Sequence, residues 1–345
     1  MAYDVLTLVF FLIVIVAASE IFTNAIEALG ARLNFSEGVT GSIFAAVGTA
    51  LPETMVPIVA IFGGGSGRAA EHISEEVGVG AILGAPFMLS TLAMFLIGLA
   101  SMRYGGRRKI KEVTPEPGGF RRDMEFFIFC FTLAFLVAFT PHGYRGVRIF
   151  VAITLVLTYF YYVMETVKAS ETLVKGGHAT EKTKGLYLSR IFKEHMFFVV
   201  LQLLFAVAMI IAGAKGFVGG VNGLSEALGL PIIAVSLLIV PVATELPEKI
   251  NSILWIKSGK DTMAVGNITG AMVFQGSLLP AIGIFLTPWT INLTVMSSAI
   301  ITIIAAVWLY YFAIKARSFS FRHMLFNGFL YLTFVFTALF IAFKH

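Results

Sequence analysis

Residues 48–53 read Gly-Thr-Ala-Leu-Pro-Glu, and residues 243–248 read Ala-Thr-Glu-Leu-Pro-Glu. Each stretch lies inside a long apolar run, where a membrane-spanning helix would be deepest in the bilayer. A carboxylate at that depth is costly, so by default it marks a site that handles ions or protons. The proline beside it removes one backbone hydrogen bond and frees carbonyl oxygens that can act as ligands. The same arrangement in both halves of a chain is typical of an inverted-repeat transporter.

The composition is that of a membrane protein. Hydrophobic residues make up 58% of the 345 residues, charged residues make up 13%, and the mean hydropathy is +0.88. A soluble globular protein carries roughly twice this charged fraction. The net charge of +5 comes from cations that cluster between apolar blocks, which favours a role in membrane orientation over nucleic-acid binding. The single cysteine, Cys130, excludes a disulfide framework and a cysteine-based zinc site.

The apolar blocks predict an all-α polytopic membrane protein with ten transmembrane helices in two inverted five-helix repeats. Most of the 25 Lys and Arg residues fall in the odd-numbered loops, so we expect these loops in the cytoplasm and both termini outside. We expect the first repeat at 1–168, a cytoplasmic linker at 169–194 and the second repeat at 195–345, in a plasma or inner membrane. The ten spans are expected near residues 3–28, 37–62, 76–102, 124–140, 147–168, 195–218, 228–256, 261–286, 290–314 and 324–343.

The two halves can be aligned residue by residue. Pro52 and Glu53 correspond to Pro247 and Glu248, at an offset of 195. Further on, Gly-Ala-Ile-Leu-Gly-Ala at 80–85 matches Gly-Asn-Ile-Thr-Gly-Ala at 266–271, at an offset of 186. The glycines in this second pair of motifs are four residues apart, a spacing that predicts close helix packing.

Glu53 and Glu248 are the first candidate ligands. Two facing carboxylates balance one Ca²⁺, and because Ca²⁺ takes about six to eight oxygens, hydroxyls and carbonyls must complete the site. Thr49 and Thr244 lie four residues before each Glu, on the same helix face, and offer both kinds of oxygen. Lys249 follows Glu248 but is expected about 100° away around the helix, with its ammonium reaching towards the cytoplasmic interface.

Helix 3–28 carries a polar stripe. Such a stripe is expected to face protein or water rather than lipid. Its members are Ser19, Glu20, Thr23, Asn24 and Glu27.

These motifs resemble the two alpha repeats of the cation/calcium antiporter superfamily, whose best-known branch is the sodium/calcium exchangers. That superfamily carries G-T-S-L-P-E in each repeat and G-N-x-x-G-S on the following helix. The resemblance implies ion sites between the second, third, seventh and eighth helices. It also implies that the first and sixth helices move against the rest. The core ligands that it implies are Thr49, Glu53, Thr244 and Glu248.

The chain departs from the superfamily pattern and resembles a divergent member. The motif serines are replaced by Ala50, Glu245, Ala85 and Ala271, and the polar residue that follows on the third and eighth helices falls at Leu89 and Gln275. The resemblance implies that those polar groups hold flanking Na⁺ ions in sodium-driven exchangers, and most are missing here. Two roles are open for Glu245, a ligand that restores one charge or a proton carrier. Gln275, and Ser90 beside Leu89, are further possible ligands.

We therefore interpret the sequence as a secondary active antiporter that exchanges a divalent cation, in the first place Ca²⁺, for Na⁺ or H⁺ by alternating access. Two alternatives remain open: an H⁺-coupled exchanger of another metal cation, and a passive cation channel. An intramembrane enzyme is disfavoured, because no span carries a nucleophile motif or H-E-x-x-H. No resident cofactor is expected; the partners are the transported cations and the lipid bilayer.

Overall fold

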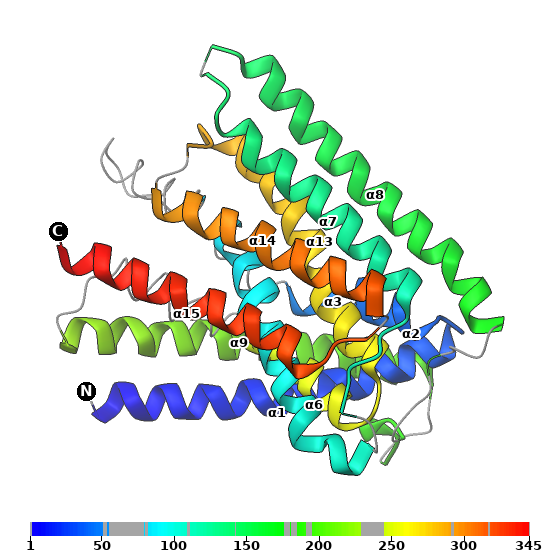
Figure 1. Ribbon diagram of the computed structural model, residues 1–345. Helices are drawn as coiled ribbons and strands as arrows, with labels where there is room; N and C mark the ends of the chain where they lie inside the picture. Colours follow the sequence, from blue (N-terminus) through cyan, green and yellow to red (C-terminus); the bar gives the residue numbers. More distant parts are fainter. Residues whose placement is uncertain are drawn as a thin grey trace.

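The computed structural model describes residues 2–50, 54, 79, 82–108, 111–141, 143–175, 180, 185–190, 195–228, 245–290, 293–316 and 318–344. The regular elements in this part of the chain are helices, and long helices form most of the molecule (Figure 1). All ten predicted spans contain helix, which confirms the all-α prediction. Among the described residues, six helices are long and apolar enough to cross a membrane: Val9–Arg32, Ile82–Gly106, Arg145–Ser170, Met196–Gly213, Asp261–Leu286 and Val295–Lys315.

The predicted span 261–286 coincides with α13. Helix α7 begins seven residues before its predicted span, and α8 and α9 end seven and ten residues after theirs. The second, third, seventh and ninth spans are described in part. The helices of the first half are α1 (Ala2–Arg32), α2 (Glu37–Val39), the π-helical turn η1 (Thr40–Ala45), α3 (Ala46–Thr49), the π-helical turn η2 (Leu89–Ala93), α6 (Met94–Arg108), α7 (Pro117–Val137) and α8 (Arg145–Lys175). Those of the second half are the short 3₁₀ turn η3 (Tyr187–Arg190), α9 (Met196–Leu228), α12 (Leu246–Lys257), α13 (Asp261–Leu286), α14 (Leu293–Ala316) and α15 (Phe321–Lys344).

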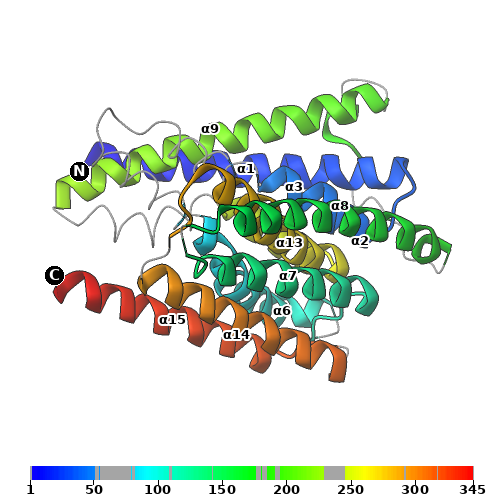
Figure 2. The same ribbon diagram turned by 90° about the horizontal axis from the view of Figure 1, so that it is seen from above.

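Helix α13 forms the centre of the molecule. It packs against α7, α8, α12 and the short segment η1–α3. Helices α1 and α9 lie side by side at one edge, and α14 and α15 lie on the other side of α13 (Figure 2). The pairing of α1 with α9 brings the first and sixth predicted spans together.

The polar stripe of α1 faces protein, as predicted. Ser19, Thr23, Asn24 and Glu27 are buried, whereas Glu20 is exposed and accepts a hydrogen bond of 2.9 Å from the Tyr187 hydroxyl. These polar side chains therefore contact the rest of the molecule rather than lipid.

Close packing between the two halves depends on glycines of α13. A Cβ added at Gly266 would lie 2.9 Å from the Ser42 hydroxyl, and one added at Gly270 would collide with the Ser42 backbone. The small-residue prediction is therefore confirmed for α13. No described residue lies within 4 Å of a Cβ built at Gly84, so the expected close contact is not seen there, and Gly80 lies outside the described residues.

Gly270→Ala should destabilise the protein, because the new methyl group has to displace the η1 backbone. Overpacking of this kind costs about 1–3 kcal/mol, and we expect the Tm of the detergent-purified protein to fall by several degrees. Gly106→Ala on α6 is the matched control, since a Cβ there meets nothing within 4 Å. An unchanged Tm for Gly270→Ala would contradict the close approach of η1 and α13.

Candidate functional site

The backbone changes direction at corresponding positions in the two halves. Helix α3 ends at Thr49, and the next residue, Ala50, has φ −79° and ψ 6°. Helix α12 begins at Leu246, and the preceding residue, Glu245, has φ −91° and ψ 7°. Ala50 and Glu245 are separated by the same offset of 195 as the two motifs. The chain therefore leaves regular helix geometry at the same point of each motif.

The first turn after each of these points is also alike. The Thr54 amide donates to the Ala50 carbonyl at 3.2 Å, and the Lys249 amide donates to the Glu245 carbonyl at 3.3 Å. In α12, Pro247 occupies the first turn, where the missing amide proton costs nothing. The proline thus starts a helix here and presents the following residue at its first turn.

Glu248 is fully buried in that first turn. Both of its carboxylate oxygens lack a hydrogen-bond partner among the described residues. The start of α12 favours a negative charge, because unpaired amide groups and the helix dipole point at it. That effect is too small to replace a partner, since an isolated buried carboxylate costs several kcal/mol or more. This side chain is therefore a candidate cation ligand.

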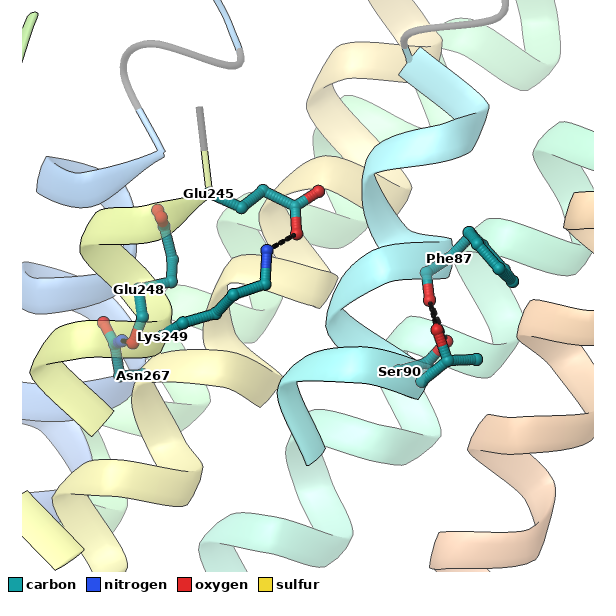
Figure 3. A network of polar contacts seen from close by, with 7 residues as sticks. Phe87, Ser90, Glu245, Glu248, Lys249 and Asn267 are labelled. Carbon is teal, nitrogen blue, oxygen red and sulfur yellow. Dashed lines mark hydrogen bonds and ion pairs between the residues drawn. The ribbon is translucent and has the colours of Figure 1, made fainter. Parts of the chain in front are cut away.

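Thr49 and Glu248, two predicted core ligands from opposite halves, are brought together. The Thr49 side chain is buried at the end of α3, which contacts α12. Its hydroxyl hydrogen is donated to the Ala45 carbonyl at 2.9 Å, so its lone pairs stay available to a bound cation. Figure 3 shows the Glu248 side chain pointing towards the end of the blue helix. The other two predicted core ligands, Glu53 and Thr244, lie outside the described residues.

Asn267 of α13 holds the start of α12 in place. Its amide nitrogen donates to the Glu248 carbonyl at 3.1 Å and lies 3.1 Å from the Ser252 hydroxyl. The Ser252 hydroxyl in turn donates to the Ala264 carbonyl at 2.9 Å. These bonds fix the backbone that carries the carboxylate. The Asn267 side-chain oxygen has no hydrogen-bond partner among the residues described.

Lys249 does not reach the cytoplasmic interface, and that prediction is wrong. Its side chain is 3% exposed, and its ammonium group lies 2.9 Å from a carboxylate oxygen of Glu245, whose side chain is fully buried. The two residues are one turn apart on the same helix face. In Figure 3, this pair points towards the cyan helix while Glu248 points the other way. Glu245 is therefore occupied by a cation from its own helix.

The two remaining candidate ligands differ in their surroundings. Gln275 is fully buried on α13, and both polar atoms of its amide lack partners among the described residues. It shares a helix stripe with Asn267, eight residues earlier. Ser90 donates to the Phe87 carbonyl at 3.2 Å and lies on the side of the cyan helix away from Glu245 (Figure 3). The structure thus leaves Gln275 available to an ion but does not group Ser90 with the glutamates.

Asp123 is a buried polar centre that the sequence interpretation missed. It accepts hydrogen bonds from Ser42 of η1 (2.8 Å), Thr269 of α13 (2.6 Å) and Tyr162 of α8 (2.9 Å). The three donors account for both carboxylate oxygens, so this acid joins four elements rather than offering an ion site. The available signal was a single acid at the start of an apolar block, which could equally have been an interfacial charge.

The family model described as sodium/calcium exchanger protein matches residues 3–167 and 198–344. The chain belongs to the sodium/calcium exchanger family. It is therefore an integral membrane transporter of the cation/calcium exchanger type, and it is not an enzyme.

Solved structures of the sodium/calcium exchanger NCX_Mj share this fold. One, soaked with Na⁺ and Sr²⁺, has a TM-score of 0.73 at 17% identity and covers 96% of this chain and 97% of that one. Another, soaked with Na⁺ and Ca²⁺, has a TM-score of 0.72 at 18% identity with the same coverage. At this identity the likeness shows the fold of the exchanger.

Relatives in sequence are distant. The sodium/calcium exchanger MaX1 of Methanosarcina acetivorans is 22% identical over 302 residues, which are 76% of this chain and 77% of MaX1. The inner membrane protein YrbG of Escherichia coli is 21% identical over 254 residues, which are 74% and 71% of the two chains. CaxA of Alkalimonas amylolytica is 28% identical over 90 residues, so the match spans only 26% of this chain and 28% of CaxA.

In this exchanger, Asn267→Ala should weaken cation binding without preventing folding. The substitution leaves the Glu248 carbonyl without its donor, so the carboxylate is no longer held in one position. We expect the apparent affinity for the transported cation to fall about tenfold, equivalent to about 1.4 kcal/mol, with a maximal rate close to that of the wild type. Transport assays over a range of cation concentrations measure both. Thr154→Ala, at an exposed position on α8, is the control, and equal affinities for the two variants would argue against the positioning role.

Proposed function

We propose that the protein is a secondary active antiporter that exchanges Ca²⁺ for Na⁺ or H⁺ at one site that opens alternately to the two sides of the membrane. The observation that carries this proposal is the Glu248 carboxylate, buried and without a hydrogen-bond partner among the described residues. A carboxylate in that environment is stable only when a cation or a proton neutralises it.

The atoms around Glu248 suit Ca²⁺. This ion prefers carboxylate, carbonyl and hydroxyl oxygens and tolerates irregular geometry. Thr49 brings a hydroxyl from the first half, and the Asn267 side-chain oxygen and the Gln275 amide are buried with unused hydrogen-bonding capacity. We propose Thr49, Glu53, Thr244 and Glu248 as the core ligands, with Gln275 as an additional one. The names of NCX_Mj and MaX1 as sodium/calcium exchangers support the choice of cation.

Because the two cations compete for one site, the protein exchanges them and does not let either one cross alone. An empty site would leave the Glu248 charge buried and uncompensated, so the closed intermediate is costly unless an ion is bound. Either cation lowers this cost by neutralising the carboxylate. The two cations therefore cross in opposite directions. After one cation is released, binding of the other allows the site to reopen to the first side of the membrane.

The packing supports α1 and α9 as the moving pair. They contact each other extensively at one edge of the molecule, whereas η1, α7, α8 and α13 are joined through Asp123. Polar contacts link α1 to α12 and to the turn that follows it: Thr23 lies 2.8 Å from Asn251, and Glu27 accepts from Trp255 at 3.1 Å and pairs with Lys260 of the turn at 3.1 Å. We propose that sliding of α1 breaks these contacts when the site opens to the other side.

The topology of the proposed exchanger follows from its two repeats. We propose units at 1–168 and 195–345, joined by a cytoplasmic linker at 169–194, with both termini outside. The distribution of Lys and Arg supports this orientation. The relative YrbG is named as an inner membrane protein, and we propose a plasma or inner membrane for this exchanger.

Glu248→Gln should abolish exchange, because the amide keeps the shape of the side chain but cannot neutralise a cation. The measurement is ⁴⁵Ca²⁺ uptake into proteoliposomes under an outward Na⁺ gradient and, separately, an outward H⁺ gradient. We expect wild-type uptake under at least one gradient and background uptake for Glu248→Gln, with unchanged size-exclusion behaviour.

Glu165→Gln is the matched control, since this partly exposed glutamate lies on α8 and pairs with Lys168 of the same helix. Near-normal uptake by Glu248→Gln would remove the carboxylate from the site. Wild-type uptake that is indifferent to both gradients would indicate a passive channel instead.

A further inference from the structure

The Glu245–Lys249 pair is an ion pair enclosed within the protein. The ammonium and carboxylate are 2.9 Å apart, with side-chain exposures of 3% and 0%. Glu245 immediately precedes α12, and Lys249 lies in the first turn of this helix, the turn that also carries Glu248. In Figure 3 the pair lies between this helix and the cyan helix. Its charges therefore sit one helix turn from the proposed cation ligand.

The ammonium cannot leave its partner. A buried carboxylate that loses its cation retains an uncompensated charge, which is strongly destabilising. Lys249 is covalently attached one turn from Glu245, and the bond lies within one helix, so a rearrangement between helices does not break it. During transport the pair and Glu248 therefore move, or stay in place, together.

The pair is not required by the shape of the backbone. The corresponding residues of the first half are Ala50 and Thr54. Ala50 has nearly the same backbone conformation as Glu245, and both pairs form the same amide-to-carbonyl bond. There the Thr54 hydroxyl donates to the Ala50 carbonyl at 2.7 Å. At these two positions the first half thus carries no charge, whereas the second half carries an acid, Glu245, and a cation, Lys249.

We propose that the Lys249 ammonium is a built-in counter-cation that permanently occupies Glu245, so that Glu245 holds no transported ion. This inference rests on the proposed exchange function and deepens it. It makes Lys249 a specificity-determining residue: it fills a position at which a free monovalent cation would otherwise bind. The site charge left for the transported ion is then that of Glu248 and its counterpart in the other half.

Removal of the ammonium should create a new monovalent cation site. In Lys249→Met and Lys249→Gln, the Glu245 carboxylate has to recruit a cation from solution. Placing each substitution in a Glu248→Gln background removes Na⁺ binding at the transport site itself. The readout is the Tm of the full-length protein in detergent, in NaCl and in choline chloride at equal concentration. We expect Na⁺ to raise the Tm by about 3 °C for the double variants and by less than about 1 °C for Glu248→Gln alone.

The matched variant for transport is Glu245→Ala/Lys249→Thr, which copies the residues of the first half. It lacks both charges, and replacement of a whole buried pair is tolerated better than removal of one partner. We expect its apparent affinity for Ca²⁺ in the ⁴⁵Ca²⁺ assay to stay within about twofold of the wild type, whereas loss of a charged ligand would cost about tenfold or more.

Two results would overturn the proposal. A tenfold loss of Ca²⁺ affinity in Glu245→Ala/Lys249→Thr would make Glu245 a ligand of the transported ion. Equal Na⁺ effects on Glu248→Gln and on both double variants would show that no cation position opens when Lys249 is removed. Failure of the wild type to exchange ⁴⁵Ca²⁺ would count against the proposed function alone, since the Tm measurement requires no transport.

Discussion

The structure depends on the burial of one carboxylate, that of Glu248, where no described residue donates to it. Other features of α12 make this burial tolerable. Pro247 starts the helix just before the acid, so unpaired amide groups face the negative charge. Asn267 then ties the Glu248 carbonyl to α13. In the proposed mechanism a transported cation offsets the remaining electrostatic cost of burial, so the closed state is unfavourable when the site is empty.

Holding this carboxylate against the other half requires a close approach of helices. Glycines at 266 and 270 let α13 contact the backbone of Ser42. Directly beside this contact, the Ser42 hydroxyl donates to Asp123, which also binds Thr269 and Tyr162. The glycines that allow close backbone contact and the hydrogen bonds of Asp123 thus lie at the same place. They join η1, α7, α8 and α13 into one unit, against which we propose that α1 and α9 move.

The sequence predicted the spans, the repeated motif and the packing glycines of α13, because periodicity, proline position and residue size are local properties. It also predicted that Thr49 and Glu248 would meet. It did not predict the contacts of Asp123, since the three donors come from elements far apart in the chain. Lys249 was misplaced for a different reason. A lysine next to a buried acid can extend to the interface or turn back one helix turn, and only the surrounding packing decides between these.

At Ala50 and Glu245 the two halves have nearly the same backbone conformation but carry different charges. Ala50 and Thr54 are neutral, whereas Glu245 and Lys249 form an internal ion pair alongside the same amide-to-carbonyl bond. An exchanger with two equivalent halves would present equivalent ligands to its ion. Here the added acid comes with its own cation, so the net charge of the turn does not change. A change of side chains can therefore alter which cations bind. The helix break is retained, and with it the proposed alternating access.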